Sequence, residues 1–97
     1  MEHPGMEYTF SAKIWHSEWY FVSMPKEMAA DIRVYFKGSE EGWGRLKVVA
    51  KIGNSEWKTA IWFDTKRQTY LLPVKADIRK RERIGADQEV DITLWVS

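Results

Sequence analysis

The chain has 97 residues and a formal net charge of +1, and its composition is 44% apolar, 30% charged and 14% aromatic. These values predict one soluble globular domain over residues 1–97 and exclude an intrinsically disordered chain. The sequence contains no cysteine, which excludes disulfides and thiolate metal sites, and no apolar run approaches the roughly 20 residues of a membrane-spanning helix.

The first half of the chain is predicted to begin with two strands and a helix. Residues 7–15 alternate between apolar and polar side chains, which is typical of a half-buried strand, and a shorter strand follows over residues 19–23. Pro25 suits the first position of a helix, and Gly38 suits its end. Apolar side chains at helical spacing predict its buried face: Met28, Ile32, Tyr35 and Phe36.

Alternation also marks the two strands that follow. Residues 43–52 predict a strand with four inward side chains: Leu46, Val48, Ala50 and Ile52. Gly53 and Asn54 tolerate positive φ and predict a tight hairpin turn. The strand after it, over residues 56–63, carries on one face Trp57, Thr59, Ile61 and Phe63.

The rest of the chain predicts a second strand–helix–strand series. After a polar loop at residues 64–67, a strand over residues 68–74 is followed by a short, highly charged helix over residues 75–83. Residues 84–87 turn the chain into a last strand over residues 89–96. Its inward side chains are Val90, Ile92, Leu94 and Val96.

The order strand, strand, helix, strand therefore occurs twice, and the stretch "ADIR" occurs at residues 30–33 and again at residues 76–79. We interpret this as an internal repeat of about residues 7–52 and 55–96. In each copy we expect the isoleucine (Ile32, Ile78) to reach the core. The alanine is expected to allow close packing, and the Asp and Arg to face water. Six strands and two short helices in two related halves predict a mostly β protein, a small closed or partly open barrel.

Five short pieces carry a family resemblance: "WYFVSMP" (19–25), "GWG" (42–44), "WKT" (57–59), "YLLPVK" (70–75) and Arg79. Together they resemble a bacterial family known only as a domain of unknown function, whose members often precede a YdeI/OmpD-associated domain. The strand–Pro–helix–Gly-Asp–strand order also resembles the AbrB/MazE-type domains, in which two chains interleave into a double-split β-barrel that often binds DNA. The resemblance covers residues 7–96. It implies a single-chain double-split β-barrel of two fused halves, with no catalytic residues to carry over.

The sequence indicates a non-catalytic protein that needs no cofactor. Its two histidines, His3 and His16, lie in the N-terminal segment and in a turn, without the spacing of a metal site. No nucleophile-elbow motif is present either.

Basic residues are concentrated in one segment. Residues 64–84 carry seven basic and three acidic side chains, a net +4, which leaves −3 for the rest of the chain. The candidate contacts for an anionic ligand or a partner are Lys75, Arg79, Lys80, Arg81 and Arg83. The alternative is that these side chains form an ordinary solvated helix face.

Three tryptophans, Trp15, Trp62 and Trp95, fall at the outward positions of their strands. If they are exposed together they could stack on a sugar, a nucleobase or another protein. Packing under loops or helices is the alternative.

We therefore expect a cytoplasmic binding or interaction module that contacts a protein or an anionic ligand through the basic helix, with no membrane association. The N-terminal residues lack the pattern of a signal peptide. A DNA-binding regulator or antitoxin-like protein is the first alternative, and a small-molecule or sugar binder that uses exposed tryptophans is the second.

Overall fold

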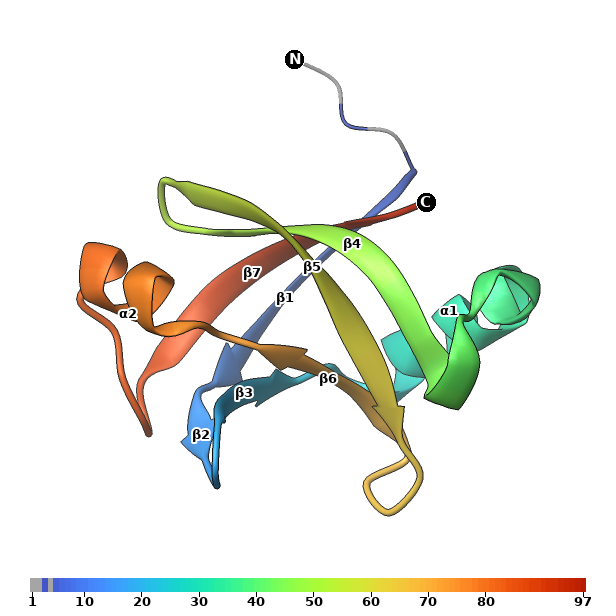
Figure 1. The fold of residues 1–97 in the computed structure, drawn as a ribbon, viewed down its shortest axis with the longest axis horizontal. Helices are drawn as coiled ribbons and strands as arrows, with labels where there is room; N and C mark the ends of the chain where they lie inside the picture. The colour runs from blue at the N-terminus through green and yellow to red at the C-terminus, as the bar shows by residue number, and fades with distance from the viewer. Residues whose placement is uncertain (1–2, 4) are drawn as a thin grey trace.

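The computed structural model describes residue 3 and residues 5–97 of the chain. These residues form one curled antiparallel sheet of seven strands and two α-helices, which lie at opposite ends of the sheet (Figure 1). The strand order is β1-β7-β4-β5-β6-β3-β2. The bounds are β1 (Met6–Lys13), β2 (Trp15–His16), β3 (Tyr20–Ser23), α1 (Lys26–Phe36), β4 (Arg45–Ile52), β5 (Ser55–Asp64), β6 (Thr69–Pro73), α2 (Ala76–Glu82) and β7 (Glu89–Val96).

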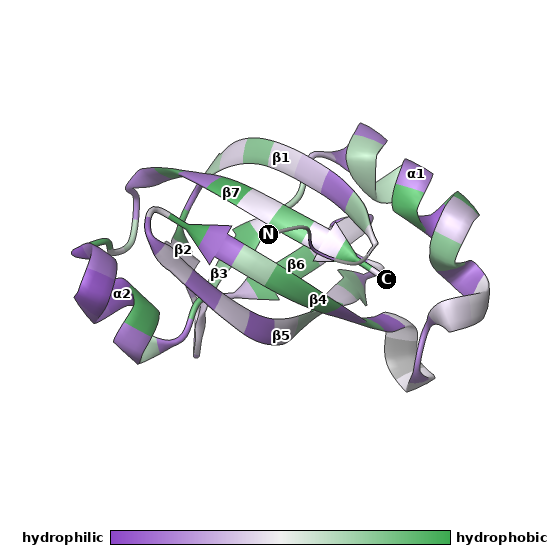
Figure 2. Ribbon diagram, turned by 90° about the horizontal axis from the view of Figure 1, so that it is seen from above, coloured by the Kyte–Doolittle hydropathy of each residue, from purple (hydrophilic) through white to green (hydrophobic). Residues whose placement is uncertain are grey.

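The core lies on the concave side of this sheet, and the alternating residues predicted for β4 and β7 fill it. Every one of these eight side chains is at most 7% exposed. The two strands pair from Val48 opposite Val96 to Ile52 opposite Ile92. Figure 2 shows the resulting alternation of hydrophobic and hydrophilic residues along the strands. Burial of this face is the main force that fixes the register, because a shift by one residue would expose the whole set.

The strand predicted over residues 7–15 is divided at Ile14, which is fully buried. The Ile14 N–H donates to the Gln88 carbonyl at 2.9 Å, and the Ile14 carbonyl accepts from the Asp87 N–H at 2.7 Å. On either side of this point, β1 pairs with β7 while β2 pairs with β3. The two edge strands of the sheet are therefore consecutive in the chain, which is why the sheet curls.

The first helix differs from its prediction in three details. Ile32 is fully buried and Met28 and Phe36 are half-buried, as predicted, but Tyr35 is 66% exposed because the buried stripe runs through Ala29 instead. Pro25 is the N-cap and not the first helical residue. The helix also does not end at a glycine: the chain tightens after Phe36 into a 3₁₀ turn, η1 (Lys37–Ser39), and a second one, η2 (Gly42–Gly44), precedes β4.

The two "ADIR" stretches occupy different positions in their helices. Ala30 is the fifth residue of α1, whereas Ala76 is the first residue of α2. Ile32 and Ile78 both reach the core, as predicted. Neither alanine packs closely, because both are exposed.

The arginines of the two stretches also differ from the prediction that they face water. The Arg33 guanidinium lies 3.9 Å from the Phe63 ring centroid, and that of Arg79 lies 3.6 Å from the Tyr20 centroid. Both side chains are half-buried, so cation–π contacts rather than solvent fix these two groups.

The predicted hairpin joins β4 to β5 at Gly53, whose φ of +58° explains why glycine is found there. β5 pairs with β4 over its length from Ser55 to Trp62, but with β6 only from Trp62 to Asp64. The first part of β5 therefore has a strand neighbour on one side only. β6 and β5 diverge there, toward α2 (Figure 1).

When β1 and β2 are counted as one strand, the strand pairing is unchanged if this strand, β3 and β4 are exchanged with β5, β6 and β7. Two hydrogen bonds follow the same exchange: the Met24 N–H donates to the Tyr70 carbonyl, and the Val74 N–H donates to the Tyr20 carbonyl. This relation fits the internal repeat, which stays a prediction from the sequence.

Neither α-helix of the described residues has the length and apolar character that crossing a membrane requires.

Candidate functional site

The structure separates the five basic residues predicted as contacts. Lys75 is the N-cap of α2, and Arg79 is the only one of the five that is half-buried. The others are exposed, and Arg83 ends the helix in the left-handed conformation with φ of 55°. Lys75 and Arg79 line one groove together. The predicted basic face is thus divided between a groove and the open surface of the helix.

Arg79 is held in place from two sides. Its guanidinium stacks on the ring of Tyr20, and its Nε donates a hydrogen bond to the Val74 carbonyl at 3.1 Å. Within the described residues, no carboxylate lies within 4.0 Å of this guanidinium. The terminal nitrogens of Arg79 are therefore fixed in direction and are not neutralised by an acidic neighbour.

The groove beside Arg79 has a volume of about 460 Å³ and lies where β5 and β6 diverge. We call it the Arg79 groove. Three parts of the chain form its walls: the start of β5, the stretch from the end of β6 into α2, and the segment that leads into β3. The lining residues are Glu18, Trp19, Tyr20, Trp57, Lys58, Thr59, Pro73, Val74, Lys75, Ala76 and Arg79.

Aromatic rings and cations line this groove together. Trp57 is only 8% exposed and belongs to the core, whereas Trp19 is 64% exposed. The cations are Arg79, Lys58 and Lys75, and the single carboxylate is that of Glu18. The Lys75 Nζ lies 3.9 Å from the Asp77 carboxylate, outside the groove. Flat apolar surface beside an excess of positive charge suits an anion that carries a ring.

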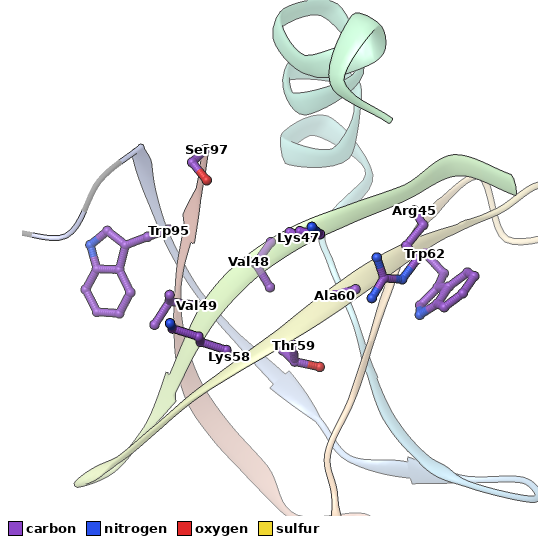
Figure 3. A pocket seen from close by; sticks show the side chains of 10 residues that line it. All are labelled: Arg45, Lys47, Val48, Val49, Lys58, Thr59, Ala60, Trp62, Trp95 and Ser97. Carbon is purple, nitrogen blue, oxygen red and sulfur yellow. The ribbon is translucent and has the colours of Figure 1, made fainter. Parts of the chain in front are cut away.

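The structure brings together two of the three outward tryptophans. Trp62, which is 40% exposed, and Trp95, which is half-buried, line a second groove of about 520 Å³ on the convex face of the sheet. We call it the outer groove. Figure 3 shows Trp95 at one end of it and Trp62, beside Arg45, at the other.

Trp15 does not join this pair. Its Nε1 donates to the Ser23 Oγ at 2.8 Å, and the Arg67 guanidinium covers its ring at 4.4 Å. Arg67 in turn bonds the Asp64 carboxylate at 2.6 Å, and this bond holds the pKa of Asp64 below its ordinary value. Through Arg67, Trp15 thus packs against the loop that follows β5.

The two histidines have structural contacts. His16 is exposed and stacks on Tyr20 with 4.3 Å between ring centroids. His3 stacks on Trp95 at 3.7 Å, and its Nε2 lies 3.0 Å from a Glu56 carboxylate oxygen. Among the described residues, no three His, Asp or Glu side chains gather in an arrangement that could hold a metal ion.

A family model described as "Domain of unknown function (DUF1905)" matches residues 10–94, which is most of the chain. The chain belongs to this family. No curated protein matches the sequence. The resemblance drawn from the five sequence pieces to a family of unknown function is confirmed in this coarser form.

Four of the five pieces that carry the resemblance to the DUF1905 family meet in the Arg79 groove. Nine of its eleven lining residues come from "WYFVSMP", "WKT", "YLLPVK" and Arg79. Lys75 and Arg79 were predicted as contacts from the sequence, but the aromatic residues that line the same groove were not: Trp19, Tyr20 and Trp57. Their presence in the same short pieces was the signal that could have found them.

Proposed function

We propose that this DUF1905 domain is a non-catalytic binding module whose Arg79 groove takes a small anionic ligand that carries a flat ring. The observation that supports this most directly is the guanidinium of Arg79, stacked on Tyr20 with no carboxylate within 4.0 Å in the described part of the chain. A fixed guanidinium presents two parallel N–H groups, which match the two oxygens of a carboxylate or phosphate.

The surroundings of Arg79 favour the same ligand. Lys58 and Lys75 add two further cations to the groove, against one carboxylate. Trp19 and Trp57 offer apolar surface on which a ring can pack. Catalysis is not part of the proposal, because the titratable lining residues are these three cations, Glu18 and the stacked Tyr20, which make no nucleophile–base pair.

Calorimetric titration with phenyl phosphate tests the proposal, with phenol as the same ring without the charge. We expect Arg79→Gln to weaken phenyl phosphate binding roughly 10-fold or more, because a charge-assisted hydrogen-bond pair is lost. The matched control is Arg81→Gln, which removes the same charge from the exposed side of α2 and should change the affinity less than 2-fold. Phenol should bind far more weakly than phenyl phosphate.

Two outcomes would contradict this function. No measurable binding of phenyl phosphate, or equal binding of phenol, would show that the groove does not select an anion. If Arg79→Gln and Arg81→Gln weakened phenyl phosphate binding equally, the ligand would contact the exposed side of α2 as well as the groove. This result would favour the alternative of a DNA-binding regulator. Thermal unfolding of both variants shows whether either change acts through stability.

We also propose that the curled sheet is a double-split barrel of two fused halves, in a cytoplasmic bacterial protein. The symmetric exchange of strand pairs supports the architecture. Origin and location rest on the sequence alone.

A further inference from the structure

The outer groove combines aromatic platforms with positive charge. It lies across three neighbouring strands, where Trp95 of β7 is opposite Val49 of β4, and Val49 is opposite Lys58 of β5. Further along the same two strands, Lys47 is opposite Ala60 and Arg45 is opposite Trp62. Ala60, almost fully buried, leaves room between the larger side chains.

The two tryptophans are too far apart to hold one ring between them. From Trp62 to Lys58 is four residues along β5, about 13 Å at the usual rise. From Lys58 to Trp95 is two strand spacings, about 10 Å. The Cα atoms of Trp62 and Trp95 are therefore about 16 Å apart in this idealised sheet. Each tryptophan would have to stack on a different ring of the same ligand.

His3 limits how Trp95 can be used. It stacks on one face of the Trp95 ring at 3.7 Å, so only the opposite face is available to a ligand ring. The Trp95 Nε1 donates to a Glu7 carboxylate oxygen at 3.0 Å, which fixes the plane of the indole. The Trp95 ring is thus held in one orientation and offers a single face for stacking.

The charge between the tryptophans is positive. Arg45, Lys47 and Lys58 line the outer groove, and no Asp or Glu side chain lines it within the described residues. Glu41 lies beside it and pairs with both Arg45 and Lys47, the latter at 3.6 Å, so these two cations are partly neutralised.

The outer groove adjoins the Arg79 groove, because Lys58 and Thr59 line both. Together the two grooves are lined by five cations and one carboxylate, a net +4. The whole chain has a net charge of only +1, so the remaining residues carry −3. The two grooves thus form one path across β5 whose lining side chains are mainly cationic, and Glu41 and Asp77 lie beside it as the acidic partners of Arg45, Lys47 and Lys75.

We propose that this path binds a single-stranded nucleic acid, with two non-adjacent bases of one strand stacked on Trp62 and Trp95 and with the phosphates between them beside Lys47 and Lys58. Several rings joined by anionic linkages are what two separated platforms with cations between them would recognise. A duplex fits less well, because its bases are stacked on each other and cannot also stack on the tryptophans. This inference rests on the proposed function, since the Arg79 groove is the other end of the path.

Fluorescence anisotropy with labelled 12-nucleotide oligo(dT) and oligo(U), at 50 and 200 mM salt, tests the inference. We expect Trp62→Ala to weaken binding roughly 5- to 150-fold, the range for the loss of one stacked base. Trp15→Ala, which removes a tryptophan that lies outside both grooves, should change the affinity less than 2-fold.

Salt dependence provides a second, independent readout. Lys47→Gln should reduce the slope of log K against log salt by about 0.7, the value for one phosphate contact on a single strand. Lys51→Gln is the matched control on the same strand: it is exposed but lines neither groove, and should leave the slope unchanged. A duplex of mixed sequence should bind at least 10-fold more weakly than the single strands.

The failures of the two proposals can be told apart. If phenyl phosphate binds in an Arg79-dependent way but Trp62→Ala and Lys47→Gln leave oligonucleotide binding unchanged, this inference is overturned and the proposed function stands. If neither phenyl phosphate nor any oligonucleotide binds, both are wrong. Equal binding of duplex and single strands would also overturn the inference, since it would require no stacking on the tryptophans.

Discussion

Tyr70 shows how one side chain joins the core to the polar network at the surface. It is fully buried, its ring meets Phe63 edge-on at 5.3 Å, and its hydroxyl donates to Glu40 at 3.1 Å. Arg33 lies over Phe63 and reaches the same Glu40 carboxylate at 3.7 Å. Burial, and then the Glu40 carboxylate, raise the pKa of Tyr70 above its ordinary value of 10.

This raised pKa predicts a loss of stability in alkali. Above about pH 10 the unfolded chain releases the phenol proton while the folded chain keeps it, so the free energy of unfolding falls as the pH rises. Tyr70→Phe should cost about 1 kcal/mol at pH 7 through the lost hydrogen bond, and should show a shallower fall between pH 9 and 11. Urea unfolding at several pH values measures both.

Tyr35→Phe is the matched control, because the Tyr35 side chain is 66% exposed. Its stability should follow that of the wild-type chain across the whole pH range. Parallel curves for Tyr70→Phe and the wild-type chain would show that Tyr70 does not cause the alkaline loss.

At the scale of elements, each helix is held by a narrow apolar stripe that includes the isoleucine of "ADIR" but not its alanine. In α1 the fully buried positions are Ala29 and Ile32, and in α2 Ile78 is the one buried residue. The exposed Ala30, although part of "ADIR", contributes no packing. In α1 a small residue is therefore required at Ala29, one position earlier than the motif predicts.

Two leucine substitutions on α1 test this difference. Ala29→Leu should destabilise the fold by about 1–3 kcal/mol, because Ala29 is 1% exposed and a larger side chain forces its neighbours apart. Ala30→Leu, which introduces the same side chain at an exposed position, should change stability by less than about 0.5 kcal/mol. Urea unfolding of the two variants compares them directly. A larger loss for Ala30→Leu would contradict the packing of α1.

At the scale of the whole molecule, the fold depends on strands that are distant in the sequence. β1 pairs with β7 from Met6 opposite Val96 to Lys13 opposite Glu89, and both strands lie far from each other along the chain. The same pairing brings residues 6 and 96 together, so the ends of the sheet segment are adjacent (Figure 1).

This adjacency predicts that the order of the two halves can be exchanged. A circular permutant that joins the ends with a short Gly/Ser linker and opens the chain between Gly53 and Asn54 should fold, because it leaves every strand intact. Opening the chain instead between Val48 and Val49 should prevent folding, since β4 pairs with strands on both sides. Circular dichroism and cooperative thermal unfolding distinguish the two. A Gly53 permutant without a cooperative transition would contradict the prediction.

Much of the local structure follows from the sequence alone. Alternation in β4 and β7 determined which side chains enter the core, because a period of two leaves only one face to bury. The turn at Gly53 follows from local backbone chemistry in the same way. The parity of Trp62 and Trp95 also placed both on the outer face of the sheet.

The tertiary structure alone decided which of these residues meet. No sequence pattern shows that β5 pairs with β6 only from Trp62 onward, and the divergence of the two strands before Trp62 creates the Arg79 groove. Nor could a count of charges show that Arg79 turns onto Tyr20 while Arg81 stays exposed, because both are arginines of the same helix. The sequence determined the faces of single elements through local periodicity, and only long-range strand pairing determined the grooves between them.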